Sequence, residues 1–204
     1  MSLFEPSESV LADDERGRIA YTPRFVDLAL AQGWFAELRE AVSWKAERRW
    51  MYERKVDVPR LTAHFRLAPE EEADAAPAAI LQAAQRVVSG TGVAFNSVGL
   101  NRYRDGRDSV APHNDHLDEI VEGSPIALVS LGATRRMTIR AKTPARRWLH
   151  VDLEAGSLLM MSYATQLHYT HGIPKTAEAV GERISLAFRV KPPRASAGAR
   201  GLYR

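Results

Sequence analysis

The sequence predicts a mainly β fold, in which two N-terminal helices buttress a sandwich or double-sheet barrel. Three observations predict this fold. The 204 residues are 45% hydrophobic and 26% charged, which suits one globular domain with a sizeable core. Two segments with helical periodicity lie before residue 90. After residue 90, short β-type runs alternate with Gly, Pro and Asp turns without intervening helices, which is unlike a parallel α/β sheet.

The two ends of the chain differ in composition from the part between them. Residues 1–20 are acidic and polar, and we expect a flexible lead-in there. Residues 192–204 consist mainly of Pro, Ala, Gly and Arg, and we expect a mobile tail. A single domain is therefore expected over residues 21–191.

The first helix is expected over residues 27–42. Asp27 is a suitable N-cap, and apolar residues follow it near helical spacing. Gly33 weakens the pattern slightly. Trp34 and Phe35 are most simply core residues of this helix.

The second helix is expected over residues 77–88. Pro77 suits its first turn, and Gly90 lies just after its expected end. Between the two helices, residues 43–66 combine many Arg side chains with aromatic ones.

The remaining elements are expected to be strands that form the β core within residues 94–190. They are expected over residues 94–103, 126–131, 136–140, 149–153, 157–161, 168–171 and 184–190.

Composition also excludes several classes of function. The chain has no Cys, so it has no disulfide framework, thiolate nucleophile or iron–sulfur cluster. Its longest apolar runs, such as residues 156–161, are far shorter than the roughly 18 residues that a membrane span needs. No signal-peptide pattern opens the sequence, so we expect a soluble cytoplasmic protein. The net charge of +3 permits a nucleic-acid partner without demonstrating one.

The pattern His113-x-Asp115, with His171 following 58 residues after His113, is the central chemical feature. In a strand, residues i and i+2 project from the same face, so the first two side chains can point into one cavity. Two imidazoles and one carboxylate on neighbouring coordination positions suit non-haem Fe(II). The alternative is coincidence, because His-x-Asp is a common tripeptide.

Arg183 and Arg189 lie at alternating positions of the run 183–189, which overlaps the last expected strand, and so share a face. Two buried Arg side chains are costly unless an anionic ligand pairs with them, and a dicarboxylate that chelates the iron is such a ligand. The alternative places both on the solvated face of an edge strand.

Seven motifs of the chain resemble, in order and spacing, those of the AlkB family of Fe(II)/2-oxoglutarate-dependent nucleic-acid dealkylation dioxygenases. The chain looks closest to the branch with the eukaryotic nuclear homologues that repair DNA. The resemblance covers roughly residues 43–191 and implies a jelly-roll core, a double-stranded β-helix. The motifs are Asn101-Arg-Tyr103-Arg-Asp-Gly, His113-x-Asp115, Gly123-Ser-Pro-Ile-Ala, Ser130-Leu-Gly-Ala-Thr, Gly156-Ser-Leu-Leu-Met-Met, His171 and Arg183 six residues before Arg189.

The resemblance assigns roles to the residues of these motifs. It makes His113, Asp115 and His171 the iron ligands and catalytic residues, and it implies that Asn101 and Tyr103 hydrogen-bond 2-oxoglutarate.

The resemblance also assigns the two arginines of the last strand. It implies that Arg189 pairs with the distal carboxylate of 2-oxoglutarate and that Arg183 lies nearer the metal. Ser185 stands where the family commonly has Asn, and its shorter side chain reaches less far toward the cofactor.

The resemblance makes residues 43–66 a substrate lid. Within it, Arg60 is expected to face phosphate and Phe65 to stack on the flipped base. His116 and Leu117 replace the usual acidic pair after the metal Asp, so His116 is expected either to touch substrate or to be an exposed loop residue.

The activity implied by the resemblance is oxidative demethylation of N1-methyladenine and N3-methylcytosine in DNA or RNA, hence DNA alkylation repair. Its cofactors are Fe(II) and 2-oxoglutarate, with ascorbate as an added reductant, and its products are formaldehyde, succinate and CO2. We expect a monomer that binds no membrane. Two alternatives remain: a 2-oxoglutarate-dependent hydroxylase or demethylase of protein or a small molecule, and a non-catalytic nucleic-acid-binding module. His150 and His168 are expected to be structural.

Overall fold

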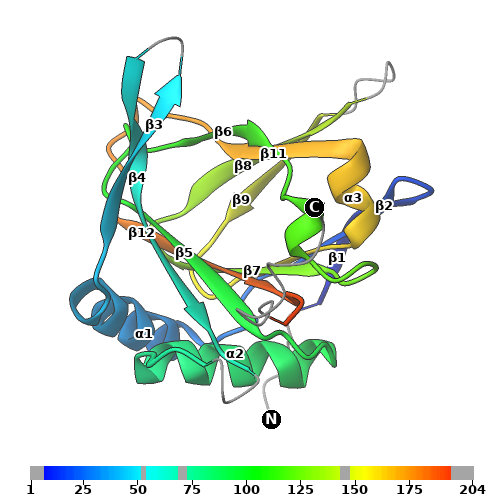
Figure 1. Ribbon diagram of the computed structural model, residues 1–204, viewed down its shortest axis with the longest axis horizontal. Coiled ribbons are helices and arrows are strands. Elements are labelled where there is room, and N and C mark those ends of the chain that lie inside the picture. The colour runs from blue at the N-terminus through cyan, green and yellow to red at the C-terminus, as the bar shows by residue number, and fades with distance from the viewer. Residues whose placement is uncertain (1–6, 52–53, 69–72, 143–147, 194–204) are drawn as a thin grey trace, which may run out of the picture.

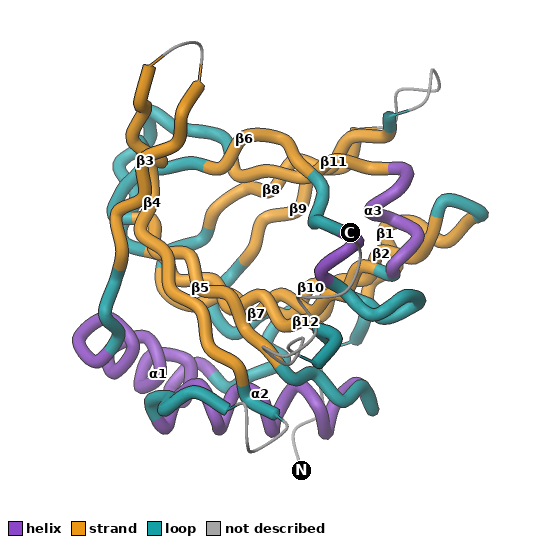
Figure 2. The backbone as a smooth tube through the Cα atoms, in the orientation of Figure 1, coloured by secondary structure: helices purple, strands orange, loops and turns teal. Residues whose placement is uncertain are grey.

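Two antiparallel β-sheets face each other, and two helices cover the outer face of the larger sheet (Figure 1). The computed structural model describes residues 7–51, 54–68, 73–142 and 148–193. The order of layers is therefore helices, large sheet, small sheet, as the tube in Figure 2 also shows. The predicted mainly β fold with two buttressing helices is confirmed.

The large sheet has eight strands and the small sheet has four. In spatial order the large sheet contains β1 (Ser9–Asp14), β2 (Gly17–Thr22), β10 (Leu158–Met161), β7 (Ile126–Gly132), β12 (Arg183–Arg189), β5 (Ser97–Tyr103), β4 (Arg54–Arg66) and β3 (Lys45–Met51). The small sheet contains β6 (Val110–His113), β11 (Tyr169–Ile173), β8 (Arg135–Ala141) and β9 (Trp148–Leu153). The seven predicted strands correspond to β5 and β7–β12, with each boundary within three residues of the expected one.

Helix α1 spans Leu28–Ala41 as predicted, because Asp27 caps it with Oδ1 2.8 Å from the backbone N–H of Ala29. Helix α2 spans Ala78–Thr91 and so continues past its expected end. The residue that ends it is Gly92, in the left-handed conformation at φ 71°, and not Gly90.

Two short helical elements follow the β6 and β10 strands and were not predicted. Helix α3 spans Tyr163–His168, and a single 3-10 turn spans Leu117–Glu119. No helix of the described residues is long and apolar enough to cross a membrane.

The strict alternation of side chains along the central strands divides the core in two. On β7, Ala127 and Val129 pack against the helices, whereas Ile126 and Leu128 pack between the sheets. Trp34 and the partly buried Phe35 belong to the helix-side core, as expected. The space between the sheets is thus lined by alternate residues of each strand, and polar members of this set form the site.

The expectation of a flexible lead-in over residues 1–20 is wrong for residues 7–20, which the structure describes. Residues 9–14 and 17–22 form the hairpin β1–β2, and β2 pairs with β10 at the edge of the large sheet. Ile19 is fully buried between the sheets. The acidic side chains face solvent, where Glu8 and Asp13 both pair with Arg18, so their charge hid the strand pattern.

The segment expected as a lid, residues 43–66, contains the hairpin β3–β4. It projects beyond the edge of the small sheet in Figure 1. The tail predicted over residues 192–204 lies almost wholly outside the described residues.

Candidate metal centre and cofactor cavity

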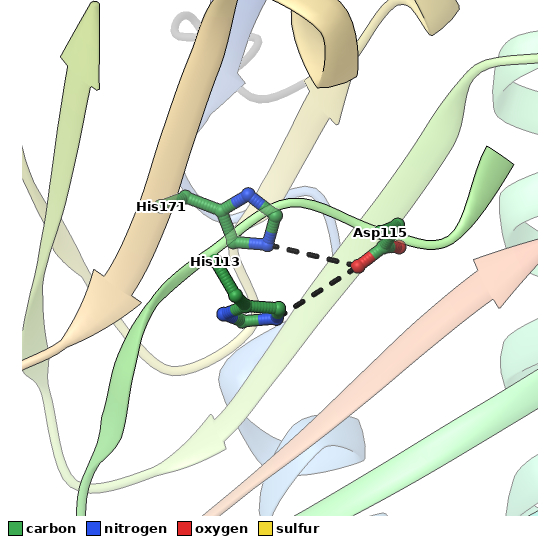
Figure 3. A group of neighbouring side chains, drawn as sticks. All are labelled: His113, Asp115 and His171. Atoms are coloured by element: carbon green, nitrogen blue, oxygen red, sulfur yellow. Dashed lines mark ion pairs between the residues drawn. The ribbon is translucent and has the colours of Figure 1, made fainter. Parts of the chain in front are cut away.

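Three side chains meet where the end of β6 lies beside β11. His113 and His171 are direct partners across these strands, and Asp115 follows two residues after His113 (Figure 3). Asp115 Oδ1 lies 3.8 Å from His113 Nε2 and 3.9 Å from His171 Nε2. One ligand atom from each residue lies within 4.8 Å of the other two, which is a spacing that one metal ion can bridge.

The protonation of these groups suits a cation. His113 Nδ1 lies 3.0 Å from the carbonyl oxygen of Ala111, which can only accept, so Nδ1 carries the proton and Nε2 keeps its lone pair. Burial, followed by the charge of His113, lowers the pKa of His171 to about 4, so this imidazole is neutral at pH 7.

Asp115 is held in its ionised form by Arg189. Burial alone raises the pKa of Asp115, but the charge and hydrogen bond of Arg189 outweigh it, so the pKa lies below its usual value. Arg189 Nε donates to Asp115 Oδ2 at 2.7 Å. A Cβ at Gly99 would lie 3.3 Å from Arg189 Nη1, so the glycine on β5 leaves room for the guanidinium.

The backbone of Asp115 has a second anchor, which the sequence did not predict. Gln166 of α3 is 1% exposed, and its Oε1 accepts the backbone N–H of Asp115 at 2.9 Å. Gln166 Nε2 in turn donates to Thr165 Oγ1 at 3.0 Å. No motif marks this glutamine; its place five residues before His171 is the one signal available.

An internal cavity extends from the two histidines between the sheets. Polar side chains from β4, β5 and β12 line it together with apolar residues of β6, β7, β8 and β11. Its polar lining consists of Arg60, Asn101, Tyr103, His113, His171, Arg183, Ser185 and Arg189. The structure therefore brings together the predicted metal-ligand and cofactor residues, with Ser185 among them.

Arg183 lies at the end of β12 remote from Arg189 and has the properties of an anion receptor. It is fully buried, and Nη2 donates to Ser130 Oγ at 2.9 Å. Its Nε and Nη1 have no hydrogen-bond partner among the described residues. The guanidinium lies 5.2 Å from the ring centre of Tyr103, and burial lowers its pKa. Leaving two such donors unpaired is costly, and a carboxylate in the cavity would satisfy both.

This geometry places the two arginines in the opposite order, relative to the metal group, from the expected one. Arg189 contacts the metal-ligand Asp115, so it lies at the metal end of the cavity. Arg183 lies six residues away on the same strand, so it is the arginine suited to the distal carboxylate of 2-oxoglutarate. The sequence established that both point inward, whereas their order relative to the metal depends on how β12 and β6 are placed.

The predicted substrate residues are only partly brought to the site. Arg60 lies at the cavity, where its Nε donates to Asn101 Oδ1 at 2.6 Å. His116 is exposed and caps the 3-10 turn, outside the internal cavity.

The expectation that Phe65 stacks on the flipped base is corrected, because its side chain does not face the site. It pairs with Val98 and packs into the helix-side core, whereas Thr62 on β4 pairs with Asn101, which lines the cavity. The alternation of side chains along β4 therefore sends Phe65 to the wrong face for base stacking. Most of the basic side chains of the expected lid belong to residues 48–57, and the structure does not describe the side chains of these residues.

His150 and His168 were expected to be structural, and the geometry keeps both out of the metal group. His150 is exposed on β9, and His168 is the last residue of α3.

The chain is similar to proteins of one family along most of its length. The family model described as "2OG-Fe(II) oxygenase superfamily" matches residues 18–189. Over 118 residues the chain is 41% identical to "DNA oxidative demethylase ALKBH2" of Homo sapiens, a match that covers 54% of this chain and 45% of that one. The chain thus spans less than half of that relative's length.

Two further similarities cover more of the chain. It is 32% identical over 192 residues to "Alpha-ketoglutarate-dependent dioxygenase alkB homolog 3" of Bos taurus, covering 86% of this chain and 67% of that one. The solved structure described as "The structure of OsALKBH1" shares the fold with a TM-score of 0.59 at 10% identity, covering 89% of this chain and all of that one. With its His-Asp-His group and the jelly-roll core, the chain belongs to the AlkB-like members of the 2OG-Fe(II) oxygenase superfamily.

Proposed function

We propose that this protein oxidatively demethylates alkylated nucleobases such as N1-methyladenine and N3-methylcytosine in nucleic acid, and so repairs alkylation damage in DNA. The observation that carries the chemistry is the three-residue ligand group at one end of the cavity, together with a buried arginine at the far end of β12 that has two unpaired donors. The substrate class is supported by relatives named as a DNA oxidative demethylase and an AlkB homologue.

His113, Asp115 and His171 would hold Fe(II), and Arg183 would pair with the distal carboxylate of 2-oxoglutarate. When bound, this pair of cofactors supplies the activation of dioxygen needed to hydroxylate a methyl group on nitrogen. The hydroxymethyl product releases formaldehyde, which leaves the restored base.

The chain's own residues prepare the centre for this chemistry. Arg189 keeps Asp115 ionised, and the carbonyl of Ala111 fixes the tautomer of His113. Asn101 and Tyr103 line the cavity between the metal group and Arg183, where they would orient the cofactor. The target atom lies within the base stack, so the base must be flipped out or unpaired at a cost of a few kcal/mol.

Mass spectrometry of a panel of alkylated oligonucleotides tests the proposal. After incubation with Fe(II) and 2-oxoglutarate, we expect loss of the methyl group from one or more N-methylated bases, with formaldehyde and succinate as co-products. Asp115→Ala is the control, and it should abolish both base repair and 2-oxoglutarate consumption.

Retention of the methyl group on every base by an enzyme that still consumes 2-oxoglutarate would contradict the nucleic-acid assignment. That result would favour the alternative of a hydroxylase of protein or a small molecule. Cytoplasmic location and a monomeric state stay predictions, which fractionation and light scattering would check.

A further inference from the structure

The outer face of the small sheet carries an exposed aromatic side chain that the metal centre does not use. Trp148 on β9 is 50% exposed. Arg140 on the neighbouring strand β8 places its guanidinium carbon 5.0 Å from the centre of this ring. His150, two residues along β9 on the same face, is stacked beside it with ring centres 6.3 Å apart and planes 24° apart.

A groove leads from Trp148 to the metal centre. It has a volume of about 590 Å³ and crosses all four strands of the small sheet, which lie side by side in Figure 1. Its lining includes Trp148, Thr138, Gly172, Pro112, Lys175 and His113. Since Thr138 lines this groove whereas its neighbour Met137 lines the internal cavity, the groove lies on the opposite side of β8 from the cofactor cavity. The groove and the cavity share four lining residues, Arg60, Val110, His113 and Ile173, so they adjoin at the metal ligand and its neighbours.

The charge of the groove is positive. Arg60 and Lys175 supply its cations, and no carboxylate occurs among the described residues of its lining. Lys175 is exposed and forms no ion pair with a described residue. A surface with fixed cations, apolar walls and an exposed aromatic ring matches a single nucleic-acid strand, whose phosphates need cations and whose bases stack on aromatic faces.

We propose that this groove binds the single-stranded segment adjoining the target nucleotide, with Trp148 as a stacking platform for a flanking base and with Arg140 and Lys175 facing its phosphates. This inference rests on the proposed function and adds to it the path of the substrate. Arg140 holds the ring in place, so little freedom of Trp148 is lost on binding. The groove opens at His113, so a base flipped from the same strand has a short path to the metal centre.

Fluorescence anisotropy with a labelled single strand of about 12 nucleotides tests the inference on the metal-loaded protein. Trp148→Ala should raise Kd about 5-fold or more, and Trp148→Phe should recover most of the loss, because a base stack is sequence-tolerant and needs only an aromatic face. Leu81→Ala is the matched control: Leu81 is 52% exposed on α2, far from the groove, and its replacement should change Kd by less than about twofold.

Charge removal gives a second, independent readout. Lys175→Gln and Arg140→Gln should each flatten the dependence of log K on log salt by about one, whereas Trp148→Ala should leave that slope unchanged. If Trp148→Ala binds the strand as tightly as the wild type, or if neither charge variant changes the slope, the groove is not the binding path.

The closing experiment separates this inference from the proposed function. His113 and Trp148 lie on the two edge strands of the small sheet, three strand spacings or about 14 Å apart. A trinucleotide with a central 1-methyladenine has only one flanking nucleotide on each side to cover this span, so Trp148→Ala should demethylate it at the wild-type rate while turning over the long strand more slowly. Equal loss on both substrates would overturn the inference but leave the demethylase intact. Failure of the wild type on both would refute the demethylase, and the anisotropy result would still decide the groove.

Discussion

Arg183, Arg189 and Arg135 lie in or near the space between the sheets, yet their partners differ. Arg189 pairs with a carboxylate, and Arg135 donates to the carbonyl oxygens of Asp105, Asp108 and Pro174. Arg183 Nη2 donates to Ser130 Oγ, whereas Arg183 Nε and Nη1 meet no acceptor at hydrogen-bond distance among the described residues. Unpaired buried donors are costly to the fold, so the contrast supports the proposal that Arg183 pairs with the cofactor.

Replacement of Arg183 should therefore act on the cofactor. Arg183→Gln should raise Kd for 2-oxoglutarate about 10-fold or more, since a hydrogen bond to a charged group contributes about 1.5–3 kcal/mol. Calorimetric titration of the metal-loaded protein with 2-oxoglutarate, under anaerobic conditions, measures this Kd. Arg135→Gln is the control, because Arg135 also lies over the Tyr103 ring, at 5.7 Å, but its Nη1 and Nη2 donate to backbone carbonyls of the fold. Arg135→Gln should lower the free energy of unfolding and leave Kd for 2-oxoglutarate unchanged. If Arg135→Gln raised this Kd and Arg183→Gln did not, the cofactor role of Arg183 would be rejected.

Gln166 offers a second prediction at the residue scale. Gln166→Met keeps the volume but leaves the buried N–H of Asp115 unpaired, which costs about 1–3 kcal/mol. Metal affinity, followed by titration with Co(II) and visible absorption, should fall several-fold because Asp115 is no longer held in place. Gln166→Glu, which keeps the acceptor, should recover part of the loss. Leu167→Ala, at the exposed neighbour, should have no effect, and unchanged Co(II) affinity in Gln166→Met would show that Asp115 needs no such anchor.

At the scale of elements, each of the two long helices contains a glycine, and the two glycines differ in the space around them. Gly33 in α1 is exposed, and an added Cβ would meet nothing within 4 Å. Gly90 in α2 faces Phe25, and an added Cβ would lie 2.6 Å from that ring. Phe25 is 8% exposed and is held beneath Arg86, at 4.5 Å, so its ring has little room to move.

The two glycines should respond to alanine with opposite signs. Gly33→Ala should raise the free energy of unfolding by about 0.5–1 kcal/mol, the usual difference in helix propensity. Gly90→Ala should lower it by about 1–3 kcal/mol, because the methyl group overpacks the contact with Phe25. Urea denaturation of both variants measures this, and a gain in stability from Gly90→Ala would mean that the ring moves aside freely.

For the molecule as a whole, enclosing the ligand group between two sheets makes stability depend on pH. Burial, then the charge of His113, lowers the pKa of His171 to about 4 in the folded state, against an ordinary value near 6.5. Below about pH 6.5 the unfolded chain therefore takes up a proton that the folded protein refuses. The stability contributed by neutral His171 is present above that pH and is lost as the pH falls toward about 4.

The metal-free protein should accordingly be less stable at pH 5 than at pH 7.5, with about 2 kcal/mol of the loss due to His171. His64 acts in the same direction, because partial burial of its ring and then the charge of Lys191 lower its pKa. Urea denaturation in the presence of a chelator gives the free energy of unfolding at each pH. His171→Gln should show a smaller drop than the wild type, and an identical drop in both would exclude His171 as the source.

Much of the fold and of the candidate site could be predicted from the sequence, because the signals that carry them are local. The period of two along a strand placed Arg183 and Arg189 on one inward face, and β12 confirms it. Capping chemistry at Asp27 and helical periodicity predicted α1, and turn residues divided the chain after residue 90 into seven of its eight observed strands. Strand β6, which carries His113, was not predicted. The spacing of His113, Asp115 and His171 predicted a metal group that the structure assembles.

Other features depended on which segments pair across long distances in the chain, and no local pattern encodes that. The pairing of β2 with β10 turned an acidic lead-in into part of the large sheet. The register of β4 on β5 turned Phe65 toward the helices, since a shift of one residue reverses every side chain. The placement of β6 beside β11 put Asp115 against Arg189, whereas Arg183 kept two unpaired donors among the described residues. Sequence periodicity therefore determined which side chains share a face, and tertiary pairing alone decided what each face meets.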